Sequence, residues 1–210
     1  MIKILVADDH AVVRNGLKQI VSDTSDMVVA GEASNGQEAL NKALKDDYDI
    51  VLLDITMPDR SGLDILKEIK NQKPELPVLI LSMHPEEQYA VRALKAGAAG
   101  YLTKESAPEE LISAMRKVSS GSKYVTSSLA EKLASVLEIG AEKPLHQTLS
   151  DREYQVLCMI ASDKSIKQIA NELLLSAKTI STYRSRVLRK MNMNNNIELT
   201  RYAIQNQLVS

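Results

Sequence analysis

At 210 residues the chain is long enough for two modest domains, and its single cysteine, Cys158, excludes an intramolecular disulfide and a multi-cysteine zinc site. No apolar run reaches the roughly 18 residues of a membrane span and no signal peptide opens the chain, so we expect a cytoplasmic protein. Residues 1–120 carry 14 Lys and Arg against 19 Asp and Glu, whereas residues 148–210 carry 9 Lys and Arg against 5 Asp and Glu. This charge difference predicts an acidic domain joined to a basic domain suited to nucleic acid.

Short apolar runs alternate with helical patterns over residues 1–120. Strands are predicted at 2–7, 27–31, 50–53, 77–82 and 99–103. Helices are predicted between and after them, near 11–22, 36–46, 62–71, 86–96 and 108–119. Five strand–helix units in series predict an α/β fold, a doubly wound parallel sheet of five strands. Ligands of such sheets bind beyond the carboxyl ends of the strands.

The pattern changes after Val118. Residues 121–147 are predicted to be a linker with an embedded helix near 127–138. From Leu149 the sequence has helical periodicity, and Ser150 followed by Glu153 is typical of a capping box. Further helices are predicted near 165–173, 177–191 and 196–207. We therefore expect a second, all-α domain of four helices over residues 148–210.

Five polar residues stand at the carboxyl ends of the predicted strands. Asp8 and Asp9 follow the first strand, Asp54 the third and Lys104 the fifth, while Ser82 ends the fourth. Each alone is typical of a turn or cap residue, but in a parallel sheet all five converge on one edge. Three carboxylates held close together repel one another unless a cation is present, and such oxygen ligands suit Mg²⁺. With an ammonium and a hydroxyl beside them, they predict a site that accepts a phosphoryl group on Asp54.

Residues 1–120 resemble the receiver domain of bacterial two-component response regulators. The resemblance rests on VADDH (6–10), LLDITMPDRSGLD (52–64), LILSMH (79–84) and KAGAAGYLTKES (95–106).

The receiver resemblance assigns a role to each residue of the acidic site. It implies that Asp54 is the phosphoacceptor and that Lys104 pairs with the phosphoryl group. It also implies that Asp9 and Asp54 bind Mg²⁺ directly, that Asp8 binds it through water, and that the backbone carbonyl of Thr56 contributes.

The same resemblance implies a conformational switch. Ser82 and Tyr101 would form a pair in which the hydroxyl moves to the phosphate and the ring turns inward. One position departs from the family pattern: Glu105 follows the lysine where many receivers have a cis-proline, and a cis bond before Glu105 would be costly.

The predicted helix at 177–191 is amphipathic. Its apolar face contains Ile180, Val187 and Met191, and the opposite face contains Lys178, Thr182, Ser185 and Arg189. This polar face is compatible with plain solvation or with a helix lying in a DNA major groove. The preceding helix and short turn make a helix-turn-helix, which favours the groove.

Residues 148–210 resemble the DNA-binding domain of NarL/FixJ regulators, a LuxR-type unit of four helices. The matching residues are LSDREYQVLCMIA (149–161), SIKQIANELLLSAKTISTYRSRVLRKM (165–191) and IELTRYA (197–203). The resemblance implies that 177–191 binds DNA and that the fourth helix dimerises. Base contacts would come from Ser181, Thr182 and Ser185, and phosphate contacts from Lys178, Thr179, Arg186, Arg189 and Lys190. Arg184 lies nearer the inward side of the helix.

Together these features predict a transcription factor controlled by phosphorylation. Its partners would be a sensor histidine kinase and promoter DNA, with RNA polymerase as a further candidate, and phosphorylation would promote a homodimer. An aspartyl-phosphate phosphatase of the haloacid dehalogenase type would need a second Asp two residues after the nucleophile, where Thr56 stands. We therefore expect no enzyme beyond one that catalyses its own phosphorylation and dephosphorylation. A regulator whose receiver only dimerises or binds a ligand remains an alternative, against which the acidic pair and Lys104 argue.

Overall fold

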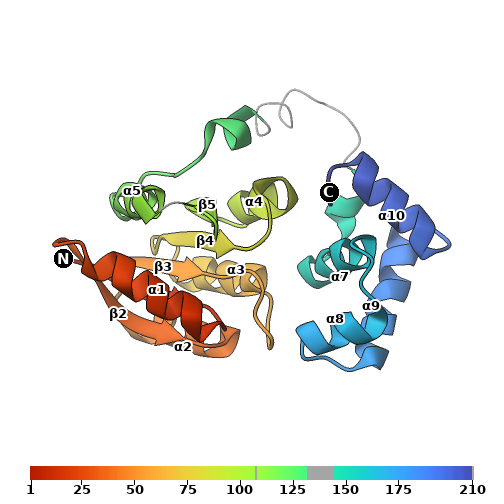
Figure 1. Ribbon diagram of the computed structural model, residues 1–210, viewed down its shortest axis with the longest axis horizontal. Coiled ribbons are helices and arrows are strands. Elements are labelled where there is room, and N and C mark those ends of the chain that lie inside the picture. Colours follow the sequence, from red (N-terminus) through yellow and green to blue (C-terminus); the bar gives the residue numbers. More distant parts are fainter. Residues whose placement is uncertain (107, 132–143, 210) are drawn as a thin grey trace. The chain divides into compact units, whose positions relative to one another are not determined.

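The computed structural model describes residues 1–106, 108–131 and 144–209 (Figure 1). The chain divides into two compact units, Met1–Ala134 and Ser135–Ser210. The division falls within the predicted linker, whose limits at 121 and 147 stay predictions. Residues 127–131 are helical, and the remainder of the helix predicted near 127–138 lies outside the described residues.

The first unit contains the parallel sheet that the sequence predicts. The strand order is β2-β1-β3-β4-β5, and every neighbouring pair is parallel. Strands and helices alternate along the chain as β1 (Ile2–Ala7), α1 (Ala11–Ser22), β2 (Met27–Ala33), α2 (Gly36–Lys45), β3 (Ile50–Leu53), α3 (Gly62–Gln72), β4 (Val78–Ser82), α4 (Glu86–Lys95), β5 (Gly100–Thr103) and α5 (Pro108–Ser119).

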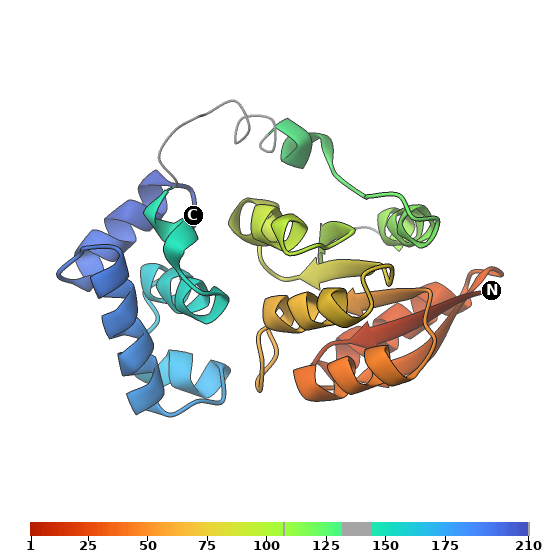
Figure 2. The same ribbon diagram turned by 180° about the vertical axis from the view of Figure 1, so that it is seen from behind.

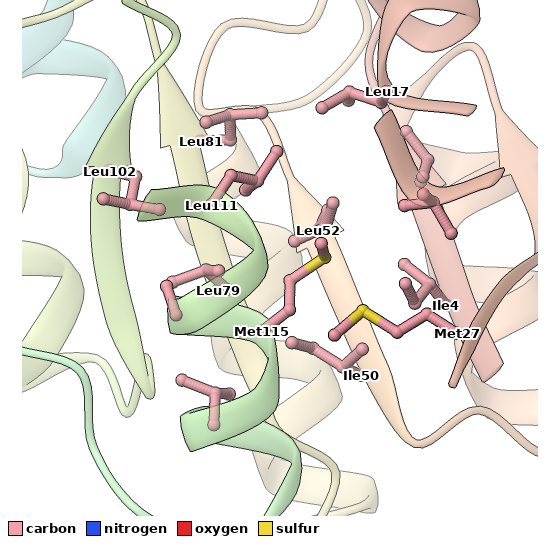
Figure 3. Packing of buried hydrophobic residues seen from close by; sticks show 14 residues of the cluster. Ile4, Leu17, Met27, Ile50, Leu52, Leu79, Leu81, Leu102, Leu111 and Met115 are labelled. Carbon is pink, nitrogen blue, oxygen red and sulfur yellow. The ribbon is translucent and has the colours of Figure 1, made fainter. Parts of the chain in front are cut away.

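One apolar core lies between the sheet and helices α1 and α5 (Figure 3). Leu17 of α1 and both Leu111 and Met115 of α5 pack with Ile50 and Leu52 of β3. Burying aliphatic side chains at about 25 cal/mol per Å² is the main stabilisation available to a core without Phe or Trp.

The central strand β3 is buried on both faces. Val51 and Leu53 are as buried as their neighbours and, by the alternation of a strand, face the other side of the sheet. Helices α2 and α3 pack beside each other there (Figure 2). The strand is therefore fixed on both sides, and this fixes Asp54 at its carboxyl end.

Gly62 lets α3 begin against the end of β3. A Cβ atom at this position would collide with the carbonyl oxygen of Asp54 and lie 2.8 Å from the Cα of Ile55. The Gly62 N–H donates a hydrogen bond to the carbonyl of Ile55 at 2.8 Å. Only glycine allows this approach, so the loop carrying Asp54 is closed by a backbone contact that a side chain would prevent.

The second unit is helical, as predicted. It contains the short 3-10 helix η1 (Leu145–Thr148), which the sequence did not predict, and then α7 (Asp151–Ala161), α8 (Ile166–Glu172), α9 (Ala177–Lys190) and α10 (Asn196–Gln205). The capping box of Ser150 and Glu153 is present at the start of α7, and Ser165 with Gln168 forms another at α8. Such caps satisfy the free N–H groups of a helix start and define where each helix begins.

The core of this unit joins α7, α8 and α9. It contains Val156, Ile160, Ile169, Leu173 and Ile180. In the described part of the chain, no helix is both long enough and apolar enough to span a bilayer.

Candidate functional sites

A lysine bridges two buried carboxylates at the carboxyl edge of the sheet. Lys104, after β5, places its Nζ 2.6 Å from Asp8 Oδ2 and 2.7 Å from Asp54 Oδ2. The side chains of Asp8 and Asp54 are 3% exposed and that of Lys104 is 5% exposed. The ammonium therefore offsets the repulsion between two carboxylates that have almost no access to water.

The second oxygen of each carboxylate is held by a backbone amide. Thr56 N–H donates to Asp54 Oδ1 at 3.1 Å, and His10 N–H donates to Asp8 Oδ1 at 2.8 Å. Both carboxylates are thus oriented by the loop that follows their own strand, which fixes their geometry before any ligand arrives.

His10 joins this site, although it was not predicted. Its Nδ1 lies 2.8 Å from Asp9 Oδ1 and 3.3 Å from Asp8 Oδ1. Ligand atoms of Asp8, Asp9, His10 and Asp54 all lie within 4.8 Å of one another. The only signal in the sequence was the position of His10 directly after the acidic pair. The cluster is an acidic pocket whose chemistry suits a divalent cation.

Burial dominates the electrostatics of Asp54. Burial raises the pKa of Asp54 from 3.8 to about 6, against the opposing effect of Lys104. Burial alone would lower the pKa of Lys104, but its attraction to Asp54 and Asp8 outweighs this and raises the pKa. At neutral pH the site therefore holds an ionised carboxylate of raised basicity beside a permanently charged ammonium, which suits a carboxylate nucleophile.

Ser82 and Tyr101 are connected through the peptide groups of the β4–α4 loop. Ser82 ends β4 and is buried, and its Oγ accepts a hydrogen bond from His84 N–H at 3.2 Å. The Tyr101 hydroxyl donates to the carbonyl of His84 at 2.7 Å. The backbones of Ser82 and Lys104 are also joined, because the backbone N–H of Lys104 donates to the carbonyl of Ser82 at 2.8 Å.

His84 extends this network toward Asp54. Its Nε2 lies 3.3 Å from Thr56 Oγ1, and the amide of Thr56 is the one that holds Asp54. His84 was not predicted as a site residue, since this contact joins positions 28 residues apart.

In the described residues no peptide bond is cis, so Lys104 is followed by a trans bond.

Helix α9 presents the predicted polar face. Ile180, Val187 and Met191 are buried in the unit. Thr179 is partly exposed, and the other predicted DNA-contacting residues are exposed: Lys178, Ser181, Thr182, Ser185, Arg186, Arg189 and Lys190.

Two hydroxyls on this face bond to their own helix. Thr182 Oγ1 donates to the Lys178 carbonyl and Ser185 Oγ donates to the Ser181 carbonyl, both at 3.0 Å. With the proton directed inward, each oxygen presents its lone pairs to solvent as a hydrogen-bond acceptor.

Two cations of α9 have partners inside the unit. Lys190 Nζ lies 2.6 Å from Glu153 Oε2 of α7. Arg184 is partly buried and its Nε donates to Asn196 Oδ1 at 2.6 Å, which agrees with its predicted inward position. A phosphate contact by Lys190 would therefore compete with Glu153.

A tight turn sets the angle between α8 and α9. Leu174 has a φ of 50°, and Leu175 N–H donates to the Ala170 carbonyl at 2.9 Å, which closes the end of α8. Ser176 then caps α9 by accepting a hydrogen bond from Thr179 N–H at 3.0 Å. The helix-turn-helix is thus held by backbone hydrogen bonds on both sides of the turn.

Known families match both units. Residues 4–116 match the model of the response regulator receiver domain, and residues 147–203 match that of bacterial regulatory proteins of the luxR family. The chain is 37% identical over 209 residues to response regulator UvrY of Escherichia coli (strain K12), covering 99% of this chain and 96% of that protein. It is 35% identical over 211 residues to response regulator GacA of Pseudomonas aeruginosa, covering 100% and 98%.

Solved structures agree with these matches. The RcsB response regulator of Salmonella typhimurium superposes with a TM-score of 0.69 at 25% identity, covering 98% of each chain. RcsB of Salmonella enterica serovar Typhimurium, bound to promoter rprA in the presence of the phosphomimetic BeF3⁻, gives a TM-score of 0.62 at 26% identity, covering 96% of this chain and 97% of that one.

The parallel sheet with its acidic pocket and the helix-turn-helix define a DNA-binding response regulator. Within that class the chain belongs to the NarL/FixJ family, in which a receiver domain is joined to a luxR-type DNA-binding domain.

Proposed function

We propose that this response regulator accepts a phosphoryl group on Asp54 from a sensor histidine kinase and binds promoter DNA through α9 as a dimer that phosphorylation promotes. The observation that carries the phosphoacceptor proposal is the contact of Lys104 Nζ with Asp54 Oδ2 at 2.7 Å in a pocket shielded from water. A carboxylate in this position is nucleophilic, and the ammonium lies where the phosphoryl oxygens would arrive.

The transfer requires three actions of the chain's own groups. An Asp54 oxygen attacks phosphorus, and the bond from phosphorus to the donor nitrogen breaks as the new P–O bond forms. Lys104 Nζ, which lies 2.6 Å from Asp8 Oδ2 before transfer, can pair with a phosphoryl oxygen. Asp8 keeps the hydrogen bond that it accepts from the His10 amide. Thr56 N–H holds the second Asp54 oxygen at 3.1 Å, which orients the carboxylate for attack.

The acidic pocket would also hold Mg²⁺. Asp9 and Asp54 are the proposed direct ligands, with Asp8 acting through water and the Thr56 carbonyl contributing. The close grouping of these carboxylates within 4.8 Å supports the assignment, because three such groups in part-buried surroundings need more positive charge than one lysine supplies. When bound, the ion neutralises charge on the phosphoryl oxygens.

The DNA-binding proposal rests on the exposed face of α9. Ser181, Thr182 and Ser185 would contact bases, and Lys178, Thr179, Arg186, Arg189 and Lys190 would contact phosphates. The second unit has a net charge of only +4 over residues 148–210, so one copy should bind weakly. Two linked copies on adjacent half-sites make the second contact effectively intramolecular, which is why dimerisation would raise affinity.

The test compares Asp54→Asn with Asp47→Asn, which makes the same chemical change at an exposed loop position. Each protein is incubated with acetyl phosphate and Mg²⁺, and phosphorylation is followed on phosphate-affinity gels with and without hydroxylamine. We expect a hydroxylamine-sensitive acyl phosphate in the wild type and in Asp47→Asn, and none in Asp54→Asn. A wild-type yield in Asp54→Asn would place the acceptor elsewhere.

A further inference from the structure

We propose that His10 is a metal ligand of the acidic pocket, and that its nitrogen makes the pocket prefer a first-row transition-metal ion such as Mn²⁺ over Mg²⁺. This inference rests on the proposed function, because it uses the carboxylates of the proposed metal site. It adds one ligand to that site, and this ligand changes which ion the site prefers. His10 Nδ1 lies 2.8 Å from Asp9 Oδ1 and 3.3 Å from Asp8 Oδ1.

The spacing of these donor atoms fits one coordination sphere. An octahedral ion with ligands at about 2.1 Å separates neighbouring donor atoms by about 3 Å. The 2.8 Å distance from His10 Nδ1 to Asp9 Oδ1 is close to this value, and the ligand atoms of the whole group lie within 4.8 Å of one another. His10 Nδ1 can therefore take a place around the ion next to Asp9, with Asp8 still acting through water, without a change in the backbone.

The imidazole of His10 lies at the rim of the pocket. His10 is the N-cap residue of α1, a position that favours Ser, Thr, Asp or Asn because their side chains accept from the first helical amides. Its side chain makes no such capping bond in the described part of the chain. The ring lies against the acidic pair instead, and its amide donates to Asp8 Oδ1 at 2.8 Å, which fixes the start of the side chain. The imidazole is 61% exposed, so a hydrated ion can reach it from solvent.

The chemistry of the donor set determines the preference. Mg²⁺ is a hard ion that prefers oxygen ligands and keeps several waters. Imidazole nitrogen is instead a ligand of first-row transition-metal ions; Mn²⁺ is the weakest binder of that series and also accepts carboxylates, so it can use both kinds of donor in this pocket. A pocket of three carboxylates and one imidazole should thus bind Mn²⁺ more tightly than a pocket of carboxylates alone, while its affinity for Mg²⁺ stays nearly the same.

The experiment measures metal binding directly on the full chain. Mn²⁺ is titrated into wild type, His10→Asn and the matched control His146→Asn by electron paramagnetic resonance, and Mg²⁺ is used as the competitor. Spin-echo modulation of bound Mn²⁺ then reports whether a histidine nitrogen is coordinated. Circular dichroism verifies that each variant is folded.

We expect nitrogen modulation in the wild type and in His146→Asn, and its loss in His10→Asn. The Mn²⁺ dissociation constant should rise about tenfold or more in His10→Asn, as it does when a residue supporting a metal site is lost, while that for Mg²⁺ should change less. Bound Mn²⁺ without nitrogen modulation in the wild type, or equal Mn²⁺ affinity in His10→Asn, would overturn the role of His10 and leave the phosphoacceptor proposal intact. Failure of the wild type to bind either ion would overturn both this inference and the proposed metal site.

Discussion

Tyr101 and Ser82 share one residue as their hydrogen-bonding partner: the Tyr101 hydroxyl donates to the His84 carbonyl at 2.7 Å, and His84 N–H donates to Ser82 Oγ at 3.2 Å. The two residues of the proposed switch are therefore joined by a single amino acid. If Ser82 Oγ moves to a phosphoryl oxygen, the His84 amide loses its acceptor, and the shift is transmitted through the His84 backbone to Tyr101.

Ser82→Ala should separate phosphorylation from its response. The hydroxyl is not the nucleophile, so the yield of acyl phosphate should stay near that of the wild type. Moving a two-state equilibrium from mostly off to mostly on needs about 5.5 kcal/mol. A hydrogen bond from one hydroxyl to a charged oxygen supplies about 1.5–3 kcal/mol of this. We expect a weakened and not an abolished rise in dimer fraction, measured by light scattering with beryllofluoride and Mg²⁺. Ser120→Ala, at an exposed serine, is the control, and unchanged dimerisation in Ser82→Ala would remove Ser82 from the switch.

Asp54→Asn should stabilise the fold at neutral pH in the absence of divalent ions. The folded pKa of Asp54 is raised from 3.8 to about 6, so its contribution to stability is fully present below about pH 3.8 and is lost as the pH rises through 6. At pH 7 the buried charge thus opposes folding, and removing it should raise the free energy of unfolding by about 1–3 kcal/mol. The gain should disappear near pH 4.

Urea denaturation followed by circular dichroism in the presence of EDTA measures this difference at each pH. Asp47→Asn, at an exposed aspartate, should show no comparable gain. A stability gain of Asp54→Asn that is the same at pH 4 and pH 7 would show that burial of the charge is not its cause.

Two glycine substitutions should have opposite effects. Gly62→Ala forces a Cβ into the carbonyl of Asp54, whereas the Cβ of Gly16→Ala in α1 meets no described atom within 4 Å. We expect Gly62→Ala to lower the free energy of unfolding by about 1–3 kcal/mol, as overpacking does. Gly16→Ala should raise it by about 0.5–1 kcal/mol, since alanine favours a helix. Chemical denaturation of both variants measures these effects, and equal stabilities would contradict the close approach at Gly62.

The pattern of apolar residues along the chain predicted the limits of those strands whose side chains must be buried. The strand at 50–53 has its predicted limits because an unbroken apolar run must be buried on both faces. The strand predicted at 27–31 extends to Ala33, since Glu32 and Ala33 pair with Val6 and Ala7 of β1. Such pairing between neighbouring strands leaves no signal in the local pattern of apolar residues.

The candidate site was predictable only as far as topology determines it. Strand ends in a parallel sheet meet at one edge, and Asp8, Asp54 and Lys104 are in contact there. The imidazole of His10, by contrast, depends on the side-chain direction at a helix start, and His84 on a loop conformation. Neither follows from spacing along the chain.

Glu153→Gln should strengthen DNA binding. The ion pair of Lys190 with Glu153 at 2.6 Å holds a cation of the proposed interface against α7. Glutamine keeps the capping box, because its amide oxygen can also accept from Ser150 N–H. Lys190 would then be free for a phosphate, and the slope of log affinity against log salt should steepen by about 0.9. Fluorescence anisotropy with labelled DNA across a salt series measures this slope. Weaker binding, or an unchanged slope, would show that Lys190 does not reach DNA.

Thr182 and Arg189 should affect DNA binding in different ways if the exposed face of α9 lies in the major groove. Thr182 Oγ1 donates to the Lys178 carbonyl at 3.0 Å, so its outward lone pairs can accept from the amino group of adenine or cytosine. Thr182→Ala should therefore cost about 1–3 kcal/mol on the best site and change the base preferred at one position. Thr182→Ser keeps the hydroxyl and is the matched control, which should retain the preference.

Arg189→Ala should instead weaken binding to every sequence and flatten the salt slope by about 0.9, because it removes a phosphate contact and no base contact. The measurement is binding of each variant to a selected site and to its scrambled counterpart across the same salt series. Equal loss on both sequences by Thr182→Ala, or an unchanged slope for Arg189→Ala, would mean that another face of α9 meets the DNA. The hydroxyls would then be solvated side chains, and the charge of this unit would act only at long range.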